Sequence, residues 1–128
     1  MDNKTILTGF NNHLEEFLKD IETLFPEDFE IKTSINYLKS VRKMNPKLVI
    51  VSWKNYISTP YKNEILCGNI DFFMKKDYNK DLEGAAYCNE IISKIEMLRR
   101  PISEMGDDNL NKTVKYIQNL TKLCELYV

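Results

Sequence analysis

Apolar side chains recur every three or four residues through most of the chain, and this spacing constrains the fold more than any other feature. In the first such stretch the apolar residues step by four, three, four and three: Phe10, Leu14, Phe17, Ile21 and Leu24. This period places the side chains along one side of an α-helix, whereas a half-buried strand would alternate at every second residue. We expect Thr8 to cap this helix and Pro26 to end it.

Two stretches that follow carry the same helical period. Asp28 is expected to cap a second helix, whose apolar side is formed by Ile31, Ile35, Leu38 and Val41. Asn45 and Pro46 then predict a break, with Asn45 as the cap of a third helix and Pro46 in its first turn. In this third helix the apolar residues are Val49, Ile50, Trp53, Tyr56 and Ile57. The run Leu48–Val51 also fits a buried strand, but the sequence offers no second strand to pair with it, so we prefer a helix.

Shorter helical segments are expected in the middle of the chain. Thr59 and Pro60 predict the start of a short helix that ends near Gly68, where a left-handed residue closes the last turn at little cost. Residues 69–76 predict one or two further helical turns.

Two more apolar stripes complete the pattern. A long helix is expected between residues 82 and 98, and a last one between residues 110 and 127, with Asp107 or Asp108 as its cap. The expected fold is therefore all-α: a single compact helical domain over residues 1–128, with about five main helices and one or two short ones.

Composition excludes several classes of protein. The chain has 128 residues, of which 43% are hydrophobic and 29% are charged, which is typical of a globular domain and not of a disordered chain. The longest aliphatic run, Leu48–Val51, is far shorter than the roughly 20 residues of a bilayer-spanning helix. No apolar segment follows Met1, so neither secretion nor a membrane partner is expected. Three cysteines without a C-x-x-C spacing fit a reducing compartment: Cys67, Cys88 and Cys124.

The residues that could carry catalysis are few. His13 is the chain's one histidine, and a Cys–His dyad is conceivable in principle, but its position beside an apolar stripe favours a structural role. The sequence contains no metal-binding spacing, no phosphate-binding glycine loop and no nucleophile elbow. Adjacent acids diverge by about 100° on a helix and so make poor carboxylate pairs. We expect no catalytic residue, no metal and no cofactor, and therefore no enzyme.

Charge is segregated along the sequence although the net charge is −1. Residues 15–30 contain seven acidic residues and one basic residue, whereas residues 31–63 contain seven basic residues and no acidic residue. Three of these bases are spaced at i, i+7 and i+11, which places them on one side of a helix opposite its apolar stripe. The candidate interaction residues within the basic block are Lys32, Lys39, Arg42, Lys43, Lys47 and Lys54.

Three interpretations of the basic block remain open. It can bind an acidic protein surface, including the acidic 15–30 face of another copy. It can bind phosphate groups of a nucleic acid, where each neutralised phosphate releases counterions. Alternatively, its cations complement the helix dipole, and the acidic helix packs beside the basic one within the same chain.

A set of aromatic and helix-boundary residues provides a resemblance over most of the chain. The residues that carry it are Phe10 to Phe17, Phe25-Pro26, Trp53 with Tyr56, Phe72-Phe73, Asp77-Tyr78, and Asn119 to Thr121 with Tyr127. In these residues the chain resembles small uncharacterised proteins of nucleocytoplasmic large DNA viruses, the giant viruses. The resemblance implies a viral protein in the host cell cytoplasm or the virion, and it supplies no functional residues.

The expected function combines these observations. We expect a non-enzymatic viral interaction protein that acts through protein–protein contacts or homo-oligomerisation. The alternative is a nucleic-acid-associated viral factor that uses the basic face of residues 31–63.

Overall fold

A computed structural model describes residues 2–68, 94 and 106–127, and these residues fold as helices without a strand among them. The helices are α1 (Asn3–Leu24), α2 (Phe29–Met44), α3 (Leu48–Trp53), the π-helix η1 (Lys54–Ser58), α4 (Thr59–Leu66) and α7 (Asp107–Leu126). The expected all-α class is confirmed. The helices predicted at 69–76 and 82–98 lie outside the described residues, so the predicted number of helices stays a prediction.

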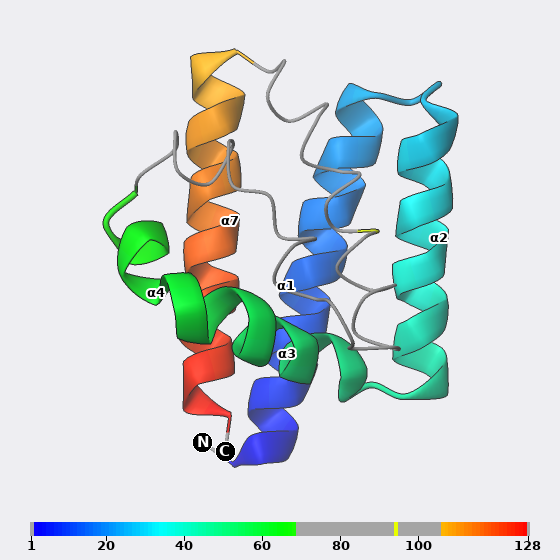
Figure 1. The fold of residues 1–128 in the computed structure, drawn as a ribbon. Helices are drawn as coiled ribbons and strands as arrows, with labels where there is room; N and C mark the ends of the chain where they lie inside the picture. The colour runs from blue at the N-terminus through cyan, green and yellow to red at the C-terminus, as the bar shows by residue number, and fades with distance from the viewer. Residues whose placement is uncertain (1, 69–93, 95–105, 128) are drawn as a thin grey trace.

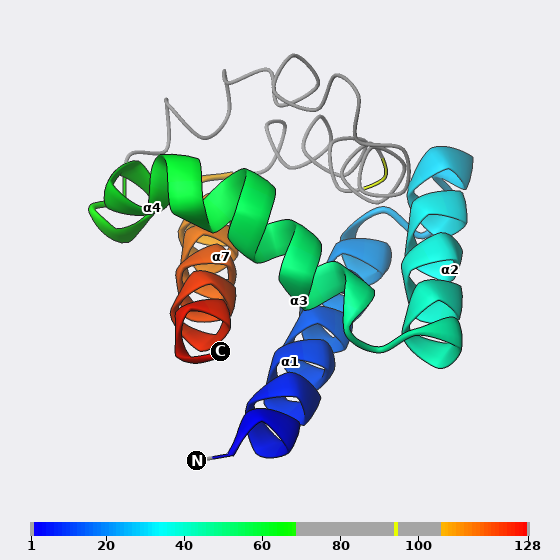
Figure 2. The same cartoon turned by 60° about the horizontal axis from the view of Figure 1, so that its bottom comes forward.

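Three long helices lie alongside one another, and a fourth helical segment crosses them (Figure 1). α1 runs antiparallel to both α2 and α7, so the start of α1 and the end of α7 lie at the same end of the three helices. Figure 2 shows the continuous run of α3, η1 and α4, here called the 48–66 segment, passing across α1 and α7. This arrangement leaves the side of α2 that faces away from α1 and the 48–66 segment at the edge of the described structure.

The first helix begins earlier than the sequence predicts. α1 starts at Asn3, and the carboxylate of Asp2 accepts the Thr5 N–H at 2.8 Å, so Asp2 and not Thr8 is the cap. Both residue types cap helices well, but capping from Asp2 adds a full turn that brings Ile6 into the core. The predicted end is confirmed, because α1 stops at Leu24, just before Pro26.

The caps around α2 follow the prediction more closely. The Asp28 carboxylate accepts the Ile31 N–H at 3.2 Å, which confirms Asp28 as the cap of this helix. After the helix, the Asn45 side chain accepts the Lys47 N–H at 3.2 Å. The prediction that Asn45 caps the third helix is wrong, because Lys47 occupies the cap position of α3 without a side-chain hydrogen bond, and Asn45 and Pro46 lie in the turn before it.

The 48–66 segment is continuous where the sequence predicts two separate helices. Pro60 explains its irregularity, because its ring would clash with the carbonyl of Tyr56 in a regular helix and it has no N–H to donate. The wider π turn shifts the pairing by one residue, so the Lys54 carbonyl accepts both the N–H and the hydroxyl of Thr59. α4 begins at Thr59 with Pro60 in its first turn, as predicted, but it follows the π turn of η1 without a break.

The ends of α4 and α7 test two further predictions. Gly68 has a φ of 77°, the left-handed conformation expected after α4, and Gln118 of α7 donates to the carbonyl of Ile65 at 3.1 Å. At the start of α7 the prediction is wrong: Gly106 occupies the cap position without a side-chain hydrogen bond, and the helix already begins at Asp107.

The core lies where the 48–66 segment crosses α1 and α7. Trp53 is 2% exposed, and its ring meets that of Phe10 edge-on at 6.0 Å between centroids. Its indole N–H donates to the hydroxyl of the buried Thr121 at 3.1 Å. Trp53 is therefore a core residue, on the buried side where its helical spacing places it.

Candidate interaction surface

The position of the basic residues follows from how α2 packs. Its apolar side is buried, formed by Ile31, Ile35, Leu38 and Val41. Because side chains on a helix are 100° apart, burial of this side turns the opposite side toward solvent. Lys32, Lys39 and Lys43 are all exposed on α2, and Lys47 is exposed just beyond its end.

Arg42 lies apart from these lysines although it is adjacent to Lys43 in the sequence. It is half-buried and faces α1, where its guanidinium contacts the Glu15 carboxylate at 2.9 Å and donates to the Asn12 side chain at 2.8 Å. The acidic helix therefore does pack beside the basic one at this point, as one interpretation of the charge pattern proposed. Arg42 is neutralised within the chain and does not join the exposed lysines.

Lys54 is also engaged within the chain. Its ammonium donates to the backbone carbonyl of Tyr127 at 2.6 Å, which ties η1 to the end of α7. Nearby, Lys62 lies 3.8 Å from the Glu125 carboxylate, and the buried Ser58 hydroxyl donates to the same carboxylate. The cations of the 48–66 segment thus serve its attachment to α7.

Four lysines of the basic block remain without such partners. Among the residues that the structure describes, the side chains of Lys32, Lys39, Lys43 and Lys47 have no ion-pair or hydrogen-bond partner. From Lys32 to Lys43 they span roughly 16 Å at the helical rise per residue, and Lys47 lies in the turn just beyond α2. Four of the six candidate interaction residues therefore share one exposed surface, and Arg42 and Lys54 do not belong to it.

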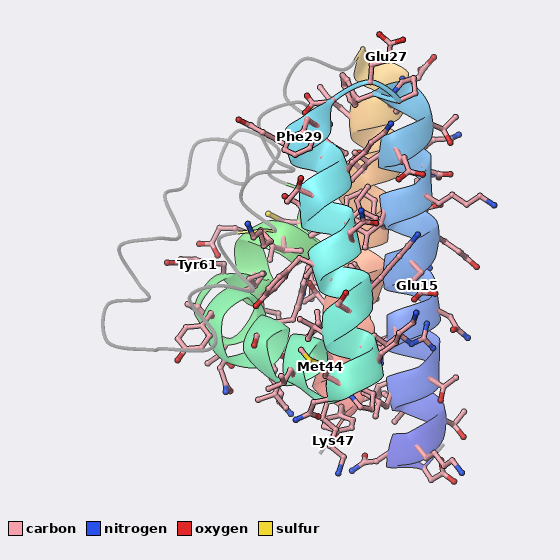
Figure 3. The ribbon with its side chains drawn as sticks, turned by 90° about the vertical axis from the view of Figure 1, so that its right-hand side faces the viewer. Glu15, Glu27, Phe29, Met44, Lys47 and Tyr61 are labelled. Atoms are coloured by element: carbon pink, nitrogen blue, oxygen red, sulfur yellow. The ribbon has the colours of Figure 1, made fainter. Side chains whose placement is uncertain are left out.

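Two large apolar side chains border the lysines, and sequence reasoning missed both. Phe29, at the start of α2, is 80% exposed, and Met44, at its end, is 77% exposed. Figure 3 shows Phe29 near one end of the helix and Met44 near the other, with Lys47 just beyond Met44. Both residues lie off the apolar stripe of α2, which is the signal that could have identified them. We call the set the basic α2 surface: Phe29, Lys32, Lys39, Lys43, Met44 and Lys47.

The acidic residues of α1 are largely engaged inside the molecule. Besides the contact of Glu15 with Arg42, the Asp20 carboxylate accepts the Tyr116 hydroxyl at 2.6 Å. This hydrogen bond raises the pKa of Tyr116 to about 12. The α1 face is therefore a weaker match for the lysines of a second copy than the sequence pattern suggests.

The described residues do not assemble the Cys–His dyad that the sequence left conceivable. The Cys67 thiol contacts the carbonyl of Glu64 at 3.3 Å, and the Cys124 thiol that of Thr121 at 3.2 Å. Burial raises the pKa of Cys124 to about 11, which disfavours a reactive thiolate. Cys88 lies outside the described residues.

The histidine itself packs as an aromatic residue. The His13 ring lies 4.9 Å from that of Tyr116, Nδ1 is 3.7 Å from the Glu16 carboxylate, and Nε2 is buried without a hydrogen-bond partner among the described residues. In the same part of the chain, no three His, Cys, Asp or Glu side chains gather as they would around a metal ion.

Two further observations complete the description of the site. None of the described helices is long and apolar enough to cross a membrane. Comparisons with protein-family models, with curated proteins and with solved structures give no match to this chain.

Proposed function

We propose that the chain is a non-enzymatic interaction protein whose basic α2 surface binds an acidic surface of another protein. The observation that carries the proposal is the separation within the basic block: Arg42 and Lys54 are paired internally, whereas four neighbouring lysines have no partner among the described residues. A cluster of exposed lysines attracts a negatively charged partner and raises the rate of association.

The apolar side chains favour a protein partner over a nucleic acid. Phe29 and Met44 are about three-quarters exposed or more, and large side chains of this kind at the borders of a charged patch are typical of protein contacts. Binding to phosphates needs the lysines but not a methionine. A nucleic-acid-associated factor remains the second candidate function, supported by the same four cations.

The resemblance to proteins of giant viruses sets where this function is proposed to operate. We place it in the cytoplasm of the infected host cell or in the virion, with a viral or host protein as the partner. An assembly of several copies is a variant of the same proposal, in which another surface of the chain provides the acidic groups.

A charge-reversal pair tests the proposal. In Lys39→Glu/Lys43→Glu the basic α2 surface is reversed, and in the control Lys19→Glu/Lys115→Glu two exposed lysines on α1 and α7 undergo the same change of charge. Both proteins, with the unmodified chain, are used for affinity capture and cross-linking mass spectrometry in infected cells. A partner that cross-links to α2, and is lost with the first variant but kept with the control, is the expected result.

The second candidate function is tested in parallel. We expect no retardation of mixed-sequence DNA or RNA at tens of micromolar protein near physiological salt, because four exposed lysines give few phosphate contacts. Retardation by the unmodified chain that disappears in Lys39→Glu/Lys43→Glu would replace the protein-partner proposal with the nucleic-acid one.

A further inference from the structure

We infer that the element which binds the basic α2 surface is an amphipathic helix of the partner, acidic along one side and lying lengthwise against α2. This inference rests on the proposed function, because it specifies the shape and chemistry of the acidic partner. It is drawn from the spacing of the lysines, the position of the apolar side chains and the size of the residues between them.

The lysines repeat at the interval of a helix. On α2, Lys32, Lys39 and Lys43 lie at i, i+7 and i+11, so Lys39 and Lys43 are about 6 Å apart along the helix axis, and Lys47 lies in the turn beyond the helix. A second helix with acidic residues three or four positions apart presents its carboxylates at the same interval. Lysine side chains are long and flexible, so their ammonium groups can follow small differences in register. The charge spacing therefore matches a helix laid along α2.

The apolar side chains mark the two ends of the contact. Phe29 and Met44 are fifteen residues apart, which corresponds to roughly 22 Å along α2. An apolar residue near each end of a partner helix, about four turns apart, would contact them. Burying two large apolar side chains supplies the affinity that exposed ion pairs give only weakly.

The residues between the ends leave room for close approach. Thr33, Asn36 and Ser40 are exposed and lie on the side of α2 between Phe29 and Met44. Helices that pack directly against each other have axes 8–10 Å apart, as a general range, and small side chains at the contact favour the lower value. A long aromatic or charged residue in this row would hold a partner helix away, and the row contains none.

The same features argue against other occupants. A helix that lies on a membrane surface needs a continuous apolar side, whereas here polar residues separate Phe29 from Met44. The acidic helix α1 of a second copy is a poor occupant, because Glu15 and Asp20 already have partners within the chain. Single-stranded nucleic acid would use the lysines and could stack on Phe29, so it is included in the test.

The test uses the full chain and two synthetic helical peptides of the same composition. In the first peptide five glutamates lie along one side of the helix and a leucine lies near each end. In the second peptide the same glutamates are distributed around the helix. Binding is measured by fluorescence anisotropy of labelled peptides near physiological ionic strength, alongside an oligonucleotide of similar charge.

We expect the first peptide to bind at least about tenfold more tightly than the second. Lys39→Glu/Lys43→Glu is expected to abolish this preference, while Lys19→Glu/Lys115→Glu leaves it within about twofold. In Phe29→Ala/Met44→Ala the affinity falls severalfold with an unchanged salt dependence, because no charge is lost. The alanine pair separates the apolar contribution from the charge contribution.

Other outcomes overturn the inference in distinguishable ways. If both peptides bind equally and binding still depends on the α2 lysines, the inference of a helical partner element is wrong, but the proposed acidic partner stands. If neither peptide binds, the inference of a helical partner element is wrong. The affinity-capture experiment then tests the proposed function separately. Tighter binding of the oligonucleotide than of either peptide, lost in the lysine variant, overturns both.

Discussion

The basic block of the sequence divides into two regions with opposite roles. In the 48–66 segment, Lys54 and Lys62 contact groups of α7, and Trp53 is buried against α1 and α7. On α2, the lysines of the basic α2 surface have no such partner among the described residues. The difference arises because α7 lies alongside one region and brings acceptors to it. Charge order along a chain therefore shows where cations occur, and the neighbouring helix determines whether they are available.

The comparison predicts its largest effect in the buried region. Replacement of Trp53 by alanine removes a side chain that is 2% exposed, its edge contact with Phe10 and its hydrogen bond to Thr121. We expect a loss of about 3–5 kcal/mol in the free energy of unfolding, measured by urea denaturation. Val51→Ala, on the partly exposed side of the same helix, serves as the control and should cost about 1 kcal/mol or less. Equal losses for the two variants would contradict the assigned core.

The second prediction concerns alkaline pH and the contacts of α7. Burial raises the pKa of Cys124 to about 11, above the ordinary value of 9.0, and the hydrogen bond to Asp20 raises that of Tyr116 to about 12, above 10.0. Between pH 9 and 12 the folded chain therefore keeps protons that the unfolded chain has released. The free energy of unfolding should fall as the pH rises through this window, by roughly 1–2 kcal/mol for the buried thiol.

Two variants divide this window between the groups. In Cys124→Ala the decline between pH 9 and 11 should be shallower than in the unmodified chain, and in Tyr116→Phe the decline between pH 10 and 12 should be shallower. Urea denaturation at closely spaced pH values measures both slopes. A Cys124→Ala variant with an unchanged slope from pH 9 to 11 would show that the thiol is not shielded as the structure describes.

The third prediction concerns Arg42, the basic residue of α2 that is paired with α1. Arg42→Gln removes the ion pair with Glu15, which is partly exposed and therefore screened by solvent. We expect a loss of about 0.5–1 kcal/mol in the free energy of unfolding. A double-mutant cycle with Glu15→Gln isolates the pair, and a coupling energy near zero would mean that α1 and α2 are not joined by this contact.

Much of the fold follows from the sequence, and the exceptions have local causes. The apolar period of α1, α2 and α7 predicts which side of each helix is buried, and Asp28 predicts a cap. The start of α1 was misjudged because Asp2 and Thr8 are both suitable caps, and the choice depends on burial of Ile6. The start of a helix at Thr59-Pro60 was predicted, but its continuity with α3 was missed, because a proline in a first turn can follow a break or a π turn. The neighbouring elements decide between these outcomes, and the sequence does not contain that information in a local form.

The candidate site was predictable in part for a similar reason. Periodicity alone turns Lys32, Lys39 and Lys43 to the outside of α2, opposite its apolar side. Arg42 is one position from Lys43 but a quarter-turn or more away around the helix, and its pairing requires knowing that Glu15 lies opposite. The exposure of Phe29 was predictable too, because its position lies off the apolar stripe of α2, but that signal was not used.

The most direct test of this account compares the loss in the free energy of unfolding when the unpaired lysines are replaced with the loss when the paired Arg42 is replaced. A variant with Lys32, Lys39, Lys43 and Lys47 all replaced by glutamine is unfolded in urea beside Arg42→Gln and the unmodified chain. If these lysines are unpaired, the fourfold variant retains its free energy of unfolding within about 0.5 kcal/mol, while Arg42→Gln loses more. A fourfold variant that loses more than Arg42→Gln would contradict the account, because the lysines would then be neutralised inside the molecule and unavailable to a partner.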